Sequence, residues 1–184
     1  AAALRASVAR HARAAAAAGR SRAGRSAVAL TSHFALIGVD AGLRLTAMAQ
    51  RWHIRRALRG SRWEGLPVVI AVTPARAGGL GGPGNYVALP SGRLRRADLA
   101  ALYPFPNLAA AIEVTGADLA AWLERGASAF RQVPPGARDA ALIDPMRPSY
   151  DFDLLDGLDW VVDLGRPAGF APDGRSLGPA GPGA

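Results

Sequence analysis

The sequence contains no cysteine and no lysine, and it has no long apolar run. Without cysteine the chain can form neither disulfides nor thiolate metal sites, and proteins of both oxidising and reducing compartments can lack this residue. Without lysine it cannot carry the phosphate-binding loop of the P-loop NTPases, because the motif of that loop requires a lysine. No segment approaches the roughly 20 apolar residues of a membrane helix, so we expect no membrane partner.

The positive charge is concentrated at the N-terminal end. The 22 basic residues are all arginine and face 14 acidic ones, which gives a net charge of +8. Residues 1–62 hold 12 of these arginines and a single acid, Asp40. Two interpretations are open: a solvated face that reflects a GC-rich genome, or a basic surface for nucleic acid or a protein partner. No aromatic residue precedes Phe34, so the arginine-rich N-terminal part has no ring on which a base could stack. We therefore do not expect nucleic acid as a partner.

The 184 residues suit one domain with two flanking segments. We expect a mobile, dispensable Ala/Arg-rich arm or linker over residues 1–25, a folded domain over 26–166 and a disordered Gly/Pro-rich tail over 167–184. Helical and alternating apolar patterns within the domain predict a mixed α/β (α+β) class. The predicted elements are helices over 40–59, 95–102 and 115–130, strands over 66–72, 86–89 and 108–114, and a hairpin of 150–154 with 158–164 around Asp156-Gly157.

A glycine-rich loop, which we call the glycine loop, covers residues 78–84 and follows a predicted strand. It matches the spacing of a dinucleotide-binding motif, but Pro83 interrupts the turn and a strand follows where that motif needs a helix. Two interpretations are left. The loop is a flexible connection, or it faces a ligand and lets the N–H groups of Gly78 and Gly79 approach an anion.

A second loop places an aromatic ring between two prolines. Pro104 and Pro106 fix the backbone on both sides of Phe105 and remove two N–H donors, and Asn107 follows directly. This pattern predicts a ring that is at least partly exposed and can support a flat ligand, the alternative being a core phenylalanine.

No catalytic or metal centre is predicted. Seven aspartates lie between positions 139 and 163, but a calcium loop that starts at Asp151 needs an acid at its fifth position, which is Leu155, and a glycine at its sixth, whereas Gly157 is the seventh. Turn and surface positions explain these acids better. The histidines are far apart in the sequence, at His11, His33 and His53.

The motifs follow one another as they do in the C-terminal domain of bacterial 5′-nucleotidases, which the chain resembles from about residue 26 to 166. Within that family it is most similar to the 2′,3′-cyclic-nucleotide 2′-phosphodiesterase/3′-nucleotidase branch. The resemblance implies a mixed sheet packed with helices and a domain that is incomplete at its C-terminus. It is carried by segments 30–36, 66–68, 102–108, 114–117, 122–124, 150–153 and 156–158.

The resemblance also implies how a nucleotide would be held. Phe105 would stack on the base and Asn107 would hydrogen-bond it, while Arg76, Gly78 and Gly79 would lie near the phosphate. The family carries an arginine directly after its paired glycines, and here that position is Leu80. This difference predicts weakened phosphate binding.

Hydrolysis in the family belongs to a separate metal-binding domain, whose ligand motifs this sequence does not contain. We therefore expect no catalytic residue and no bound cofactor in this chain, divalent metals in a metallophosphoesterase domain acting in cis or in trans, and no activity of the chain alone. The resemblance implies a periplasmic or extracellular location. The competing interpretation is a non-enzymatic basic module that binds nucleic acid or a protein through residues 1–62.

Overall fold

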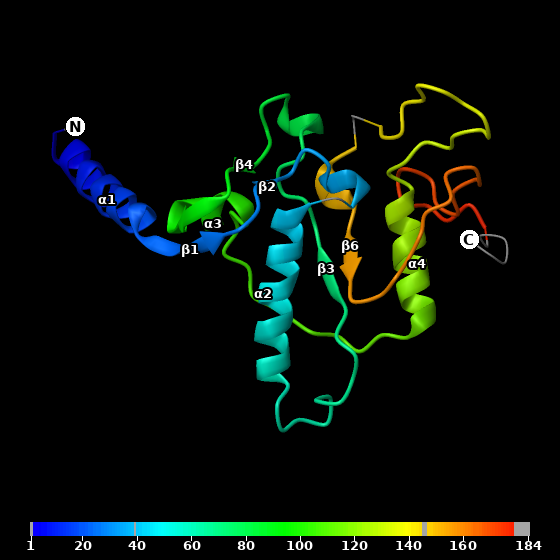
Figure 1. Ribbon diagram of the computed structural model, residues 1–184, viewed down its shortest axis with the longest axis horizontal. Helices are drawn as coiled ribbons and strands as arrows, with labels where there is room; N and C mark the ends of the chain where they lie inside the picture. Colours follow the sequence, from blue (N-terminus) through cyan, green and yellow to red (C-terminus); the bar gives the residue numbers. More distant parts are fainter. Residues whose placement is uncertain (1, 39, 145–146, 179–184) are drawn as a thin grey trace.

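The computed structural model describes residues 2–38, 40–144 and 147–178. Helices and short strands alternate along the chain, which confirms the mixed α/β class (Figure 1). The α-helices are α1 (Ala2–Arg20), α2 (Ala41–Ala57), α3 (Arg96–Leu102) and α4 (Gly116–Ala127), and short 3-10 turns are η1 (Ala35–Ile37), η2 (Gly79–Gly81) and η3 (Ser149–Asp151). No helix within these ranges is both long and apolar enough to cross a membrane.

The strands form three separate antiparallel ribbons of two strands each in the part that the structure describes. In each ribbon an early strand pairs with a later one across a long stretch of sequence. The pairs are β1 (Arg22–Ser26) with β5 (Gly92–Arg95), β2 (Leu30–Thr31) with β4 (Ala88–Leu89), and β3 (Ile70–Val72) with β6 (Leu154–Asp156).

The helices begin where local capping chemistry predicts. Asp40 caps α2, and its Oδ1 accepts a hydrogen bond of 2.9 Å from the backbone N–H of Leu43. Burial raises the pKa of this carboxyl above its ordinary value, although hydrogen bonds from the backbone of Leu43 and Gly42 oppose the shift. At α4, Thr115 and Asp118 form a reciprocal capping box, and hydrogen bonds from Thr115 lower the pKa of the Asp118 carboxyl.

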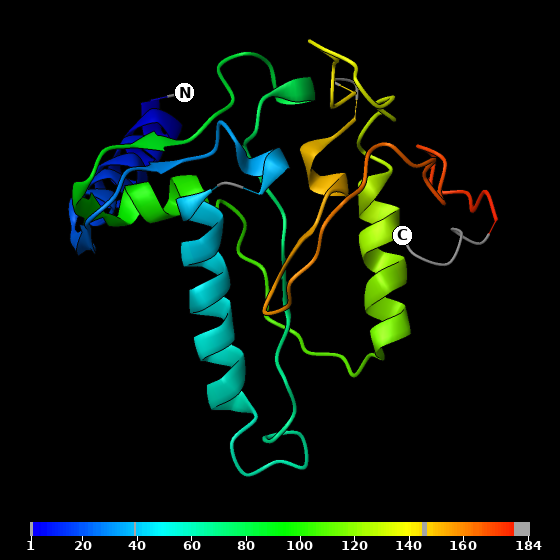
Figure 2. The same ribbon diagram turned by 45° about the vertical axis from the view of Figure 1, so that its right-hand side comes forward.

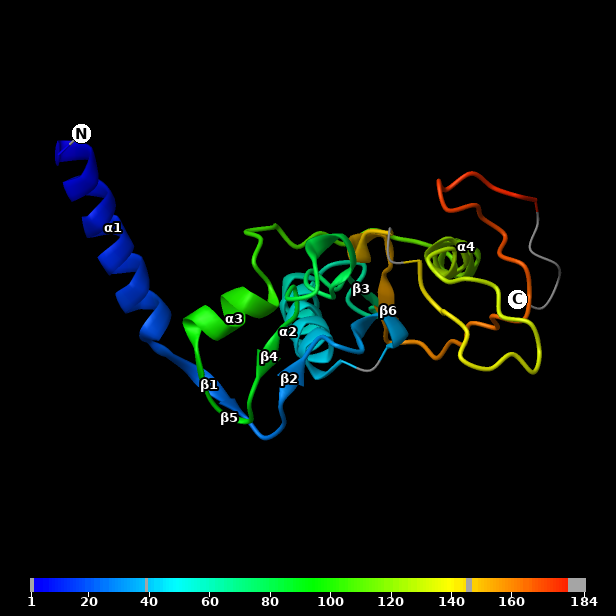
Figure 3. The ribbon, with the colours of Figure 1, turned by 90° about the horizontal axis from the view of Figure 1, so that it is seen from above.

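The core lies where α2 packs on the ribbon of β3 and β6. Ala47 of α2 and Ile70 and Val72 of β3 are buried together there. Figures 1 and 3 show β3 and β6 between α2 on one side and α4 on the other. On the α4 side, the rings of Phe130 and Phe152 meet edge to face with centroids 5.1 Å apart.

A single carboxylate joins three elements of this core. The Asp153 side chain, just before β6, accepts a hydrogen bond from the hydroxyl of Thr73, which follows β3. Its second oxygen accepts a hydrogen bond of 2.8 Å from Nε1 of Trp122 in α4. The carboxylate therefore fixes the position of α4 relative to the β3–β6 ribbon.

The chain turns sharply at Gly157, where φ is +109°. A Cβ atom there would lie 2.7 Å from Nη2 of Arg51 and 3.1 Å from the carbonyl oxygen of Val68. Glycine is thus required by both backbone angle and space. The Arg51 guanidinium instead pairs with Asp156 at 2.5 Å, which ties the end of β6 to α2.

Two strand predictions were wrong. Residues 108–114 form no strand, and Leu108 and Ile112 are 96% and 73% exposed. The predicted hairpin around Gly157 is also absent, because β6 pairs with β3 and the chain beyond the turn runs on without strand structure. The apolar run over 66–72 contributes only the three residues of β3.

The tail was expected to be disordered, but its described part packs against α4. The backbone N–H of Gly169 donates a hydrogen bond of 2.5 Å to Glu124 of α4, and Phe170 bridges to Ser176. Residues 179–184 of the expected tail lie outside the described residues.

The N-terminal segment has two different parts. Helix α1 projects from the rest of the chain, as Figures 1 and 3 show, and nearly all of its described side chains are exposed. Strand β1, in contrast, pairs with β5 and crosses the expected boundary at residue 25. The folded region therefore starts with β1.

Deleting residues 1–20 should leave the melting temperature nearly unchanged, because α1 buries too little surface to offset the ordering of its backbone. Deleting residues 1–26 should lower it, because the deletion removes the partner of β5. Thermal melts of both truncations would test this, at about 2–4 °C per kcal/mol for a chain of this size. Equal losses of melting temperature from the two deletions would contradict our conclusion that the folded region starts with β1.

Replacing Asp153 with alanine should cost about 2–4 kcal/mol, because the partly buried hydroxyl of Thr73 and N–H of Trp122 both lose their charged acceptor. Asp153→Asn is the matched control. Its amide can accept from Trp122 and donate to Thr73, so it should lose less than the alanine variant. Denaturant melts of the two variants would measure the difference, and equal losses would show that shape rather than the carboxylate matters.

Candidate functional site

The aromatic loop leaves its ring at the surface. Helix α3 ends at Leu102, and beyond Pro104 the Phe105 side chain is 58% exposed, which confirms the predicted exposure. The side-chain amide of Asn107 donates a hydrogen bond of 3.1 Å to the Tyr103 hydroxyl, and its backbone N–H donates to the Phe105 carbonyl. The loop thus presents an exposed ring next to an amide that Tyr103 orients.

The glycine loop is held by its own hydrogen bonds. The N–H of Gly78 donates to the carbonyl of Asn85, and the N–H groups of Gly81 and Gly82 donate to Gly78 and Gly79. A Cβ atom on Gly78 would lie 2.2 Å from the Tyr86 hydroxyl, so close packing requires glycine there. The N–H of Gly78 is therefore used within the loop, while Gly79 lies at the exposed surface.

Arg76 lies two residues before the glycine loop, where hydrogen bonds hold both its backbone and its side chain. Its carbonyl accepts a hydrogen bond from the hydroxyl of Ser32, and its Nε donates to Oδ1 of Asn85 at 3.2 Å. The side chain is half-buried, and no ion pair within the described ranges involves it. A guanidinium oriented by an amide but not neutralised by a carboxylate favours contact with an anion.

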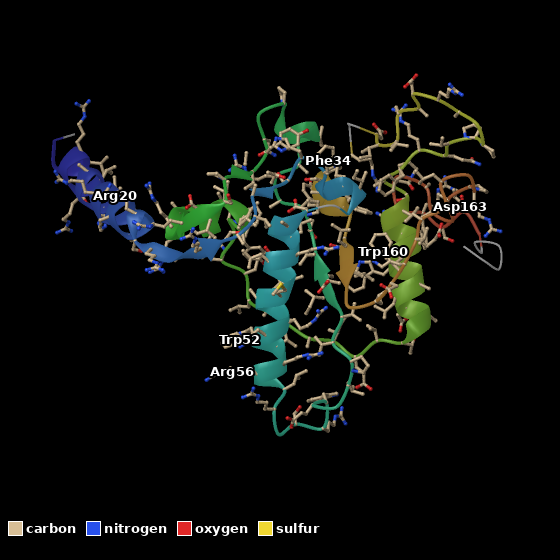
Figure 4. All side chains as sticks on the ribbon, in the orientation of Figure 1. Arg20, Phe34, Trp52, Arg56, Trp160 and Asp163 are labelled. Carbon is tan, nitrogen blue, oxygen red and sulfur yellow. The ribbon has the colours of Figure 1, made fainter. Side chains whose placement is uncertain are left out.

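Sequence reasoning missed an aromatic pair beside the glycine loop. The rings of His33 and Tyr86 stack with centroids 4.8 Å apart and an interplanar angle of 22°. Phe34, labelled in Figure 4, follows His33 and is 60% exposed. Tyr86 was visible only as a predicted strand residue, and no sequence signal connects it to a histidine so far away along the chain.

The structure does not join the two loops. In Figures 1 and 2 the glycine loop lies above the start of α2, whereas the chain after α3 runs down beside α2. No hydrogen bond, ion pair or ring contact between described residues connects Arg76, Gly78 or Gly79 with Phe105 or Asn107. A separate groove of about 760 Å³ runs along α4 beside Trp160 and Asp163, away from both loops (Figure 4).

Metal binding finds no support in the donor set. In the ranges that the structure describes, no group of three or more histidine and carboxylate side chains could hold a metal ion. Asp153, the best placed carboxylate near the core, already accepts hydrogen bonds from Thr73 and Trp122.

Comparison with known proteins identifies the family. The family described as 5′-nucleotidase, C-terminal domain, matches residues 45–171, well over half of the chain. The chain belongs to this family. The match includes both loops, most of α2, all of α4, and the β3–β6 ribbon.

The curated relatives are nucleotide phosphoesterases. The trifunctional nucleotide phosphoesterase protein YfkN of Bacillus subtilis is 30% identical over 159 residues, which cover 86% of this chain and 11% of that protein. The 2′,3′-cyclic-nucleotide 2′-phosphodiesterase/3′-nucleotidase of Haemophilus influenzae is 31% identical over 80% of this chain and 23% of its own length. The protein of the same name from Yersinia enterocolitica is 32% identical over 74% of this chain and 22% of its own length.

This 5′-nucleotidase C-terminal domain spans only about a tenth to a quarter of these relatives. No solved structure matches it.

Because the Phe105 ring is mostly exposed, replacing it with alanine should change the free energy of unfolding only slightly. Phe152 provides the matched control, since its ring is 3% exposed and packs on Phe130. Phe152→Ala should cost about 3–5 kcal/mol. Chemical denaturation of both variants would measure the two effects, and a large loss from Phe105→Ala would assign that ring to the core.

Proposed function

We propose that this 5′-nucleotidase C-terminal domain recognises the nucleotide for a metal-dependent phosphoester hydrolase that acts in nucleotide breakdown. The observation that supports the proposal most is the exposed Phe105 ring beside Asn107, in a chain whose relatives are named for acting on nucleotides. A ring held by two prolines loses little freedom when a base stacks on it.

Base recognition would combine stacking with one hydrogen-bonding group. The π-face of Phe105 accepts any base, and such a contact contributes about 1–3 kcal/mol. The Asn107 amide, oriented by Tyr103, would hydrogen-bond the edge of the stacked base. Stacking provides affinity and the amide provides preference among bases.

The phosphate would be bound by Arg76 and Gly79. Arg76 has a charge that no carboxylate neutralises in the described residues, and Gly79 permits close approach of an anion. Leu80, which is 57% exposed, stands where the family has an arginine. A nucleotide that reaches both loops requires them to approach one another, so we expect binding in the millimolar range, at about 4 kcal/mol.

The chemical step would take place elsewhere. This chain would bind and orient the nucleotide, and a metallophosphoesterase domain in cis or in trans would hold the divalent metals and cleave the ester. Such metals activate the attacking water and stabilise the charge on the phosphate. We include in the proposal a periplasmic or extracellular location and the absence of hydrolysis by the chain alone.

The test is a titration of the chain with adenosine and 3′-AMP, followed by NMR. Phe105→Ala should lose about 1–3 kcal/mol of affinity for both ligands while the thermal melt stays unchanged. Leu80→Arg should tighten 3′-AMP but not adenosine, because only the nucleotide carries a phosphate.

Phe34→Ala is the control, because it removes another ring that is mostly exposed. If Phe34→Ala abolishes binding and Phe105→Ala does not, the base binds beside the glycine loop and the proposed base site is wrong. Turnover of 3′-AMP or a 2′,3′-cyclic nucleotide by the purified chain with Mn²⁺ would refute the absence of hydrolysis.

A further inference from the structure

The ribbon of β1 and β5 pairs arginine with arginine. Arg22 lies opposite Arg95, and Arg25 lies opposite Arg93. Like charges directly opposite each other destabilise an antiparallel pair. None of the ion pairs found between described residues involves these four side chains, and the Asp98 carboxylate next to them accepts its hydrogen bond of 2.6 Å from the backbone N–H of Arg95.

Three of these arginines surround a hollow together with Arg20, the last residue of α1. Arg20, Arg22, Arg93 and Arg95 line a space of about 410 Å³ where α1 passes into β1. Figure 3 shows α1 leading directly into this ribbon, and Figure 4 labels Arg20 at the junction. Four arginine side chains around one open space match the oxygen atoms of phosphate, because each guanidinium group can contact a phosphate through two N–H donors.

Helix α1 extends the same charge along one face. At 3.6 residues per turn its arginines, Arg5, Arg10, Arg13 and Arg20, fall within a sector of about 140°. The first and last are about 22 Å apart along the axis. The helix contains no acidic residue. Arg20 belongs both to this helix face and to the lining of the hollow, and we call the two together the arginine track.

We propose that the arginine track binds the phosphate backbone of a single-stranded nucleic acid, a function distinct from the proposed recognition of a nucleotide. No phenylalanine, tyrosine or tryptophan occurs in α1, β1 or β5, and the single imidazole there is His11 of α1, so we expect the track to contact mainly phosphates. Binding would be independent of sequence and would weaken steeply with salt.

The structure favours nucleic acid over a membrane surface. An interfacial helix needs a broad face of large apolar side chains opposite its basic face. The large apolar side chains of α1 are Leu4 and Val8 near its start, and most other positions are alanine.

The position of these arginines around one hollow argues against codon bias as the full explanation of the basic charge. A genome that favours arginine explains how many arginines the chain has, but not why those of β1 and β5 converge. Two of the four that line the hollow, Arg93 and Arg95, lie outside residues 1–62.

The experiment measures fluorescence anisotropy of a labelled oligothymidylate with the full chain between about 50 and 200 mM salt. Arg22→Gln/Arg93→Gln removes one arginine from each strand. It should weaken binding about tenfold or more and reduce the slope of log affinity against log salt by about 1.4, at about 0.7 per lost phosphate contact. Its melting temperature should stay equal or rise, because both like-charge pairs are relieved.

Arg55→Gln/Arg59→Gln is the matched control, since it removes the same charge from the exposed C-terminal end of α2, which contains Arg56 (Figure 4), and from the turn that follows the helix. This control should retain affinity within about twofold. An abasic phosphodiester chain of the same length should bind as well as the oligothymidylate.

Four outcomes would overturn the proposal. They are no binding at the lowest salt, an equal loss in the α2 control, failure of the abasic chain to bind, and tighter binding to phosphatidylserine vesicles than to the oligothymidylate.

Discussion

The segment from Phe152 to Asp156 holds the fold together, and the Asp153 carboxylate is its central contact. Successive residues of this segment reach different neighbours. Phe152 packs on the ring that follows α4, Asp153 joins Thr73 to Trp122, and Asp156 pairs with Arg51 of α2. A two-stranded ribbon is marginally stable in water, so β3 and β6 depend on the helices that these side chains hold against them.

What could be predicted from the sequence depended on the range of the interactions. The helices α2 and α4 were predictable because Asp40 and the Thr115–Asp118 box act within one turn. Strand pairing was not predictable in the same way, because β6 had two possible partners, the segment after Gly157 and the distant β3. The turn at Gly157 was visible in the local pattern, but the Arg51–Asp156 pair, which holds the end of β6 against α2, joins residues far apart in the sequence and was not.

In the candidate sites too, features set by neighbouring residues were predictable from the sequence, and features set by distant residues were not. The exposure of Phe105 followed from Pro104 and Pro106, which act on the immediate backbone. The stack of His33 on Tyr86 and the convergence of arginines from β1 and β5 depend on strand register, which sets which residues of distant segments become neighbours. Composition indicated an arginine-rich N-terminal region but not the surface that those residues form with β5.

The exposed connection between α3 and α4 divides the chain into two interlocking parts. A protease cleaves most readily at an extended, exposed stretch, and the segment around Leu108 and Ile112 is one. Its two products would still share the β3–β6 ribbon, the Thr73–Asp153 hydrogen bond and the Arg51–Asp156 pair. Covalent continuity at this point is therefore not what holds the core, which makes the connection a natural place to split the domain into two fragments that reassemble.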